Sequence, residues 1–161
     1  MHRCAPALDV CSRLGRLRDS ELVADAVAAG TVAALLSGAP STLHAIARRS
    51  DPLEASLAAG TLLAPRERRA SRLLAAALAV HAALSLGWAV VLAAVLPRRA
   101  TVAWSLPAGL AIAALDLGLV GRRFERIRAL PTAPQVLDHL AYAATVGWVL
   151  SRRRSRRARA R

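Results

Sequence analysis

Residues 73–96, LLAAALAVHAALSLGWAVVLAAVL, are 24 consecutive residues without a charge. As an α-helix they would reach about 36 Å at about 1.5 Å per residue, which exceeds the roughly 30 Å hydrocarbon core of a bilayer. Arg72 precedes the stretch and Pro97-Arg98-Arg99 follows it, so charged residues mark both of its ends. This pattern predicts a membrane-spanning helix.

Further apolar runs fit the same environment. They cover residues 22–47, 101–120 and 135–150. The first run is broken at Pro40, which is expected to kink or end the helix, and Ser41 could cap the continuation. A shorter helical pattern at 51–64 could lie at the interface or re-enter the bilayer. We therefore expect an all-α transmembrane helical bundle over residues 22–150, with about four spans plus one short interfacial or re-entrant helix.

Composition supports this class of protein. Hydrophobic residues make up 55% of the 161 residues and are clustered in the runs, which favours a lipid environment over a soluble core. All 23 basic residues are arginine, and the chain has no lysine or asparagine, which is typical of a GC-rich bacterial genome. The arginines stand at the ends of apolar runs and are not interleaved with aromatic residues. They therefore favour anionic headgroups over a nucleic-acid partner.

Two basic segments flank the predicted bundle. Residues 1–21 are expected to form a cytoplasmic N-terminal segment, and residues 151–161 a disordered Arg-rich tail. With four spans both ends share one side, which then holds 13 arginines against 10 on the other. We therefore predict a multi-pass protein of the bacterial inner (plasma) membrane with a cytoplasmic C-terminus. A fifth span through residues 53–64 would place the N-terminus on the other side of the membrane.

Helix neighbours can also be predicted. The tight turn at Arg98-Arg99 predicts that the helices of 73–96 and 101–120 are antiparallel neighbours. Small residues allow membrane helices to approach closely. Such contacts are expected in the second and last spans at Ala79, Ala83, Gly87, Ala143 and Gly147.

Ionisable side chains inside a bilayer are costly and usually face the interior of a bundle. The candidates for a buried polar site are His44, His81, Asp116, Asp138 and His139. Because each crossing reverses the chain, all five are expected in the same half of the bundle. Asp25 is expected in the other half.

This cluster permits several interpretations. Carboxylates with imidazoles could relay protons or bind a divalent metal, and two inward histidines could ligate haem iron. The alternative is structural, with hydrogen bonds inside the bundle and pairing with Arg122 or Arg123. His2, Cys4 and Cys11 lack a recognised metal-ligand spacing. Without a nucleophile elbow, P-loop or HExxH motif, no enzyme, catalytic residue, metal or cofactor is predicted.

Three segments, PSTLHAIA (40–47), HAALSLGWAVVLAAVLPRR (81–99) and DHLAYAATVG (138–147), resemble small multi-span bacterial integral membrane proteins of unknown function. Those proteins carry an Asp-His-x-x-aromatic-small motif in the last helix, which corresponds here to Asp138-His139-x-x-Tyr142-Ala143. The resemblance covers most of 22–150 and implies a membrane location without an activity.

The function expected from the sequence is that of a non-enzymatic membrane protein, either structural or partner-binding. The alternative is a proton-linked or small-solute transport protein that uses the His/Asp cluster. The expected partners are the lipid bilayer and either further copies of the chain or another membrane protein.

Overall fold

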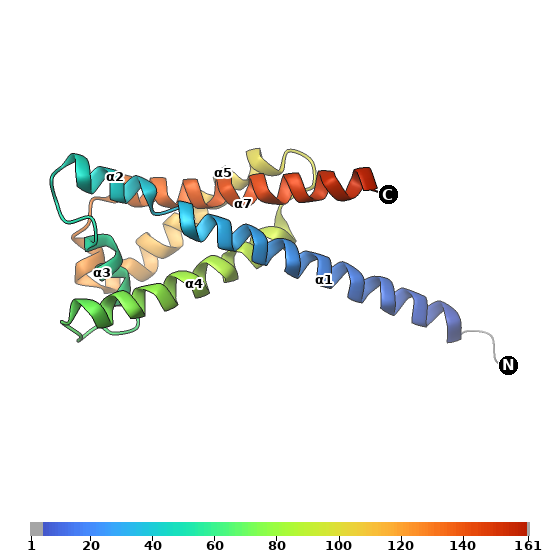
Figure 1. The fold of residues 1–161 in the computed structure, drawn as a ribbon, viewed down its shortest axis with the longest axis horizontal. Helices are drawn as coiled ribbons and strands as arrows, with labels where there is room; N and C mark the ends of the chain where they lie inside the picture. The colour runs from blue at the N-terminus through green and yellow to red at the C-terminus, as the bar shows by residue number, and fades with distance from the viewer. Residues whose placement is uncertain (1–4, 161) are drawn as a thin grey trace.

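The computed structural model describes residues 5–160, with side chains from Ser20 onward, and within that range the chain forms helices joined by turns and loops, without a strand (Figure 1). The elements are α1 (Ala5–Leu36), α2 (Ala39–Ala47), α3 (Glu54–Gly60), α4 (Ala70–Val95), α5 (Thr101–Leu115), the π-helical turn η1 (Asp116–Val120), the 3-10 turn η2 (Gly121–Arg123), α6 (Glu125–Arg128) and α7 (Thr132–Ala160). The all-α prediction is confirmed. His2 and Cys4 lie outside the described residues, as does the side chain of Cys11.

Three helical stretches are long and apolar enough to cross a membrane. They are Ser20–Ala47, Ala70–Val95 and Thr101–Arg123. The fourth predicted span, 135–150, lies within α7, which is not one of the three. Gln135, Asp138 and His139 make the first half of α7 more polar, and arginines fill its last turns.

The long helices pack in the order α5, α7, α1, α4. α7 lies along both α5 and α1, and α1 also lies along α4. α4 and α5 leave their shared turn in opposite directions but diverge without packing together (Figure 1). The prediction that they are neighbours is therefore wrong, because a turn holds two helices together only at its own end. α3 contacts α4 and α6 on the side of the bundle where α4 and α5 have separated.

Pro40 interrupts the first apolar run, as predicted. α1 ends at Leu36, and α2 begins at Ala39 with Pro40 in its first turn, where the missing N–H costs no helical hydrogen bond. Gly38, not Ser41, occupies the N-cap position. Ser41 instead uses its side chain and backbone N–H on another helix.

Small residues determine which helices come closest. A Cβ on Gly109 of α5 would lie 2.7 Å from the Ala143 Cβ, and one on Gly147 of α7 would lie 2.5 Å from the Ser105 Oγ. The prediction that small residues allow a close approach of helices is thus confirmed for Ala143 and Gly147. It is wrong for the second span, because Ala79 and Ala83 are exposed and a Cβ on Gly87 would meet nothing within 4 Å.

The C-terminal residues 151–160 continue α7 as helix, so the prediction of a disordered tail is wrong. Arg153 Nε donates to Asp25 Oδ1 at 2.5 Å, and Arg157 donates to both oxygens of the same carboxylate at 2.6 and 2.9 Å. The Asp25 side chain is only 7% exposed. Two guanidinium groups therefore neutralise a buried carboxylate of α1 and hold the end of α7 against it.

A third arginine fixes the same end of α7 to α4. Arg154 donates to the carbonyl oxygens of Ala93 at 2.9 Å, Leu96 at 3.1 Å and Pro97 at 3.3 Å. The last carbonyls of a helix lack intrahelical partners, and an arginine there also complements the helix dipole. Arg154 thus caps α4 from a different helix.

The other end of the bundle holds a salt bridge between two short helices. Arg126 of α6 donates to the two carboxylate oxygens of Glu54 in α3, at 2.7 and 2.8 Å. These hydrogen bonds lower the pKa of Glu54 below 4.5. The Glu54 side chain is 41% exposed to solvent, and the Arg126 side chain is 34% exposed. Solvent screening keeps such a pair weak.

The lowered pKa of Glu54 makes this salt bridge dependent on pH. A carboxyl whose pKa falls on folding contributes its full stabilisation above the unfolded value of 4.5 and loses it as the pH falls through the lowered folded value. Arg126→Gln is expected to reduce the free energy of unfolding by about 0.5–1 kcal/mol at neutral pH, and by nothing in acid. Chemical unfolding at several pH values tests this, with the exposed Arg128→Gln as control. An equal loss at all pH values would contradict it.

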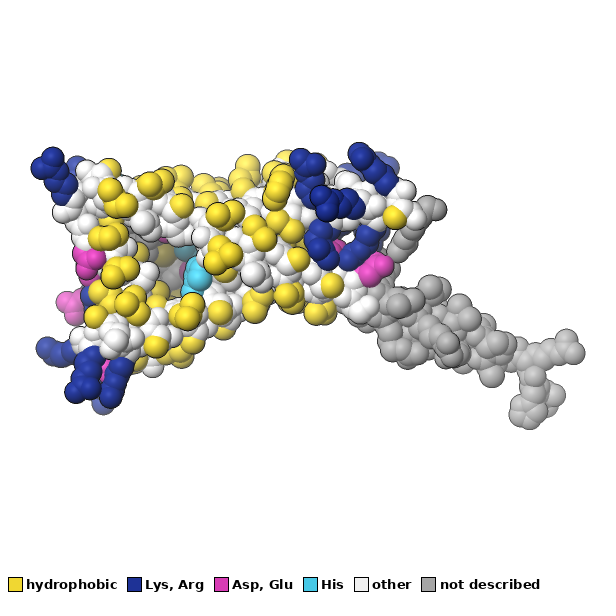
Figure 2. All heavy atoms as spheres, viewed as in Figure 1, with side chains coloured by type: hydrophobic (Ala, Val, Ile, Leu, Met, Phe, Trp, Pro, Cys, Tyr) yellow, Lys and Arg dark blue, Asp and Glu magenta, His cyan; other side chains and the backbone are white. Residues whose placement is uncertain are grey.

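The surface is apolar between two basic ends. Figure 2 shows hydrophobic side chains over the middle of the bundle, with arginines gathered at its two ends. Leu35, Leu78 and Val95 are 81%, 71% and 65% exposed. A surface of this kind would be unfavourable in water and matches a hydrocarbon environment.

Candidate functional site

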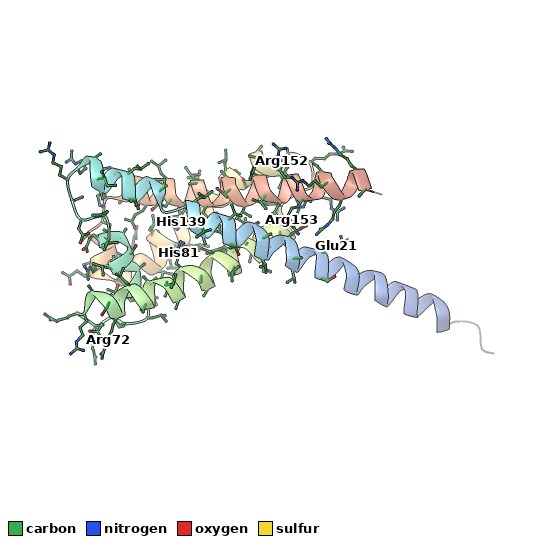
Figure 3. All side chains as sticks on the ribbon, viewed as in Figure 1. Glu21, Arg72, His81, His139, Arg152 and Arg153 are labelled. Carbon is green, nitrogen blue, oxygen red and sulfur yellow. The ribbon has the colours of Figure 1, made fainter. Side chains whose placement is uncertain are left out.

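Polar side chains from three helical segments gather near the start of α7. Asp138 and His139 belong to α7, Asp116 to η1 and His81 to α4, and Figure 3 shows His81 and His139 at the same level of the bundle. Asp25 lies at the opposite end, with the last turns of α7. The fold therefore divides these groups between the two halves of the bundle in the way that we expected from the sequence.

Asp138 is bound by the N-terminal turn of α2. Its carboxylate accepts the backbone N–H of Ser41 at 2.9 Å and, in a very short contact, the Ser41 hydroxyl. Both oxygens of Asp138 are thereby hydrogen-bonded, and the contact joins residues 97 positions apart. The break at Pro40 makes it possible, because the first N–H groups of a helix have no intrahelical acceptor.

His139 lies between the backbone of its own helix and Asp116. Nδ1 of His139 lies 2.8 Å from the carbonyl oxygen of Gln135, which can only accept, so this nitrogen carries hydrogen. Nε2 lies 3.3 Å from Oδ2 of Asp116. The contact places an imidazole nitrogen beside a carboxylate oxygen, two groups that can exchange a proton.

The backbone at Asp116 has an unusual form. α5 changes there into a π-helical turn, and the N–H of Gly121 bonds to the Asp116 carbonyl. A Cβ on Gly121 would lie 2.9 Å from that oxygen. Such widened turns occur often at functional sites, and this one sets the position from which Asp116 meets His139.

His81 joins α4 to α1. Its Nε2 lies 2.8 Å from the Ala34 carbonyl oxygen, in the last turn of α1 before the break. His81 is exposed at the bundle surface. Figure 2 shows a hollow on one face of the bundle with a histidine at its edge. Nδ1 of His81 has no hydrogen-bond partner in the described part of the chain, so it can accept a hydrogen bond from another molecule.

A hydrogen bond that the sequence did not indicate joins α7 to α4. The buried Tyr142 hydroxyl donates to the Ser85 carbonyl at 2.5 Å. Gly30 of α1 lies beside the same carbonyl, since a Cβ there would be 3.0 Å from it. Tyr142 belongs to the Asp-His-x-x-aromatic-small motif, but the backbone acceptor that it uses leaves no sequence signal. Ser41 was missed because its hydroxyl was interpreted as a cap.

The remaining candidate, His44, does not join the cluster. It is half-buried in α2, and no hydrogen bond or ion pair connects its side chain to the other four candidates. Among the residues whose side chains are described, no three His, Cys, Asp or Glu groups are arranged to hold a metal ion. The arrangement can therefore bind and exchange protons and hold helices together.

The fold and these contacts define an all-helical chain with three helices able to cross a membrane. No known protein family, curated protein or solved structure matches the chain. The resemblance based on Asp138-His139-x-x-Tyr142-Ala143 therefore stays a prediction.

Proposed function

We propose that this chain is a non-enzymatic integral membrane protein with four crossings that acts as a structural or partner-binding subunit. Its C-terminal end would lie in the cytoplasm of a bacterial cell. The proposal rests on the three apolar helices, on the exposed apolar surface and on the use of polar side chains inside the bundle.

The first half of α7 is the proposed fourth crossing. It lies between α5 and α1, and its side chains at Tyr142, Val146 and Leu150 are buried among them. A helix in that position can carry Asp138 and His139 because they face other helices instead of lipid. The low hydropathy of α7 is therefore compatible with a crossing.

One observation carries the structural role: polar side chains form hydrogen bonds that connect pairs of helices. Ser41 to Asp138 joins α2 and α7, His139 to Asp116 joins α7 and η1, and Tyr142 to Ser85 joins α7 and α4. His81 to Ala34 joins α4 and α1 in the same way. In lipid such hydrogen bonds contribute about 0.6 kcal/mol each, and up to about 2.

An experiment with two readouts tests the proposal. Asp138→Asn and His139→Gln are each expected to lower the free energy of unfolding by about 0.5–2 kcal/mol, while proteoliposomes of the wild-type chain show no proton flux above empty vesicles. Pyranine fluorescence measures the flux, and SDS titration measures the stability. The control is Gly87→Ala, because a Cβ added at Gly87 would meet nothing within 4 Å.

A proton-linked transport protein is the second candidate, favoured by the contact between the His139 imidazole and the Asp116 carboxylate. It predicts a wild-type proton flux that disappears in His139→Gln and Asp116→Asn while both variants still fold. That result would replace the structural proposal. A chain extracted from membranes by alkaline carbonate would contradict both candidates.

A further inference from the structure

The end of the bundle that holds the α4–α5 turn and the last turns of α7 combines exposed arginines with exposed tryptophans. Arg98 and Arg99 lie in the turn, and Arg152 follows Trp148 by one helical turn on α7. Trp104 and Trp148 are 59% and 53% exposed. Exposed tryptophans inside an arginine layer are typical of the headgroup region of a bilayer.

The arginines of α7 divide between two faces of the helix. Arg153 and Arg157 face α1 and are occupied by Asp25. Residues 148, 152, 156 and 159 share the outer face by helical spacing, and Figure 3 shows Arg152 and Arg153 on different sides of α7. Arg152 lies over the Trp148 ring, with its guanidinium carbon 5.7 Å from the ring centroid. We call Trp148, Arg152, Arg156 and Arg159 the outer stripe.

The positive charge of the outer stripe is not neutralised within the described part of the chain. Among the side chains that the structure describes, the acidic residues of this end are Glu21 and Asp25, which lie with Arg153 and Arg157 on the inner face. No described carboxylate bonds Arg98, Arg99, Arg152 or Arg156. Burial and then the neighbouring Arg98 charge lower the pKa of Arg154, so Arg98 of the turn and Arg154 of α7 are close enough to repel one another.

We propose that the outer stripe, together with the Arg98-Arg99 turn, binds the phosphate of anionic phospholipids, with Trp148 packed against the lipid at the base of its headgroup. The depth is suitable, because Arg152 and Arg156 lie about 6 and 12 Å beyond Trp148 along the helix axis. Guanidinium groups pair with phosphate through two parallel hydrogen bonds. The proposal rests on the membrane location proposed above.

A lipid is favoured over a nucleic acid as the anion. The outer stripe is continuous with an apolar helix surface and contains one aromatic ring, at the depth of the apolar boundary. Nucleic-acid grooves instead place several aromatic rings between basic residues. The opposite end of the bundle has arginines at 48 and 49 but no tryptophan, since residues 88, 104 and 148 are the three in the chain.

The test uses the fluorescence of Trp148 alone, in the full chain carrying Trp88→Phe and Trp104→Phe. The protein is reconstituted with dibrominated phosphatidylglycerol or dibrominated phosphatidylcholine, because bromine on the acyl chain quenches only a tryptophan that it contacts. We expect the anionic lipid to occupy the Trp148 site with about three- to five-fold preference. Arg152→Gln with Arg156→Gln should bring this ratio to about one, and high salt should reduce it.

Arg48→Gln with Arg49→Gln is the matched control, which removes the same charge at the opposite end and should keep the preference. Equal quenching by the two lipids in the chain that carries only Trp88→Phe and Trp104→Phe would overturn the lipid site. The membrane location would stay intact. Failure of both lipids to quench, with release by alkaline carbonate, would instead remove the membrane location. Binding of a DNA duplex that is lost in the Arg152 and Arg156 variant, without lipid preference, would assign the stripe to nucleic acid.

Discussion

Asp25→Asn is expected to be among the most destabilising single changes in the chain, lowering the free energy of unfolding by about 2–4 kcal/mol. The Asp25 side chain is 7% exposed, and both of its oxygens accept from guanidinium groups. Without the carboxylate, Arg153 and Arg157 stand close together with only the partly exposed Glu21 nearby, 3.7 Å from Arg157. SDS titration measures the loss, and we also expect hydrogen exchange at residues 151–160 to become faster, because Arg153 loses its partner on α1 and Arg157 keeps only this longer ion pair.

Glu125→Gln is the control for charge alone, since it removes one carboxylate from an exposed position at the other end of the bundle. A surface change of this kind should alter stability by less than about 0.5 kcal/mol. Equal stability of Asp25→Asn and the wild type, with residues 151–160 still protected, would show that α7 holds its end without this carboxylate.

The contact between α5 and α7 is expected to be equally sensitive to size. Gly109→Leu introduces a side chain where even a Cβ would lie 2.7 Å from Ala143 and 3.0 Å from the His139 carbonyl. α5 must then move away from α7, at a cost of about 1–3 kcal/mol or more. The same movement would separate Asp116 from His139, since the two lie on these two elements.

Gly87→Leu makes the same substitution where nothing lies within 4 Å of the added Cβ. Its stability should equal or slightly exceed that of the wild type, because leucine favours helix more than glycine does. SDS titration of the two variants gives the comparison. If Gly109→Leu were as stable as Gly87→Leu, the close approach of α5 and α7 would have no importance for the fold.

The sequence allowed the helices themselves to be predicted well. The uncharged run 73–96 becomes Ala70–Val95, and the break at Pro40 falls between Leu36 and Ala39. Both follow from local physics, namely the length of an apolar run and the missing N–H of proline. The division of ionisable residues between the two halves was also predictable, because it depends only on the alternation of direction between helices.

The lateral arrangement was not predictable from the same information. The turn at Arg98-Arg99 indicated that α4 and α5 would pack, but Gly109 and Gly147 bring α5 to α7 instead. Which small residue meets a partner depends on the rotation of each helix. The sequence places Ala79, Ala83 and Gly87 on a stripe as regular as the one that is buried.

Of the candidate site, the sequence indicated the titratable groups but not their partners. Asp116 and His139 were both candidates and do meet, whereas His44 was a candidate and does not join them. The partners of Asp138 and His81 are Ser41 and a backbone carbonyl, which no residue type announces. The tail was misjudged for a related reason, because the contacts of its arginines with Asp25 and with the last carbonyls of α4 come from distant parts of the sequence.

The position of α7 between α5 and α1 determines how the chain can be assembled as it is synthesised. α7 emerges after the other described helices, yet it supplies the neighbour of α5 and both guanidinium partners of Asp25. For a chain inserted as we propose, the earlier helices remain without these partners until α7 has been synthesised. A premature stop before residue 151 would therefore leave an unneutralised carboxylate in a loosely packed intermediate, the kind of species that quality-control proteases remove.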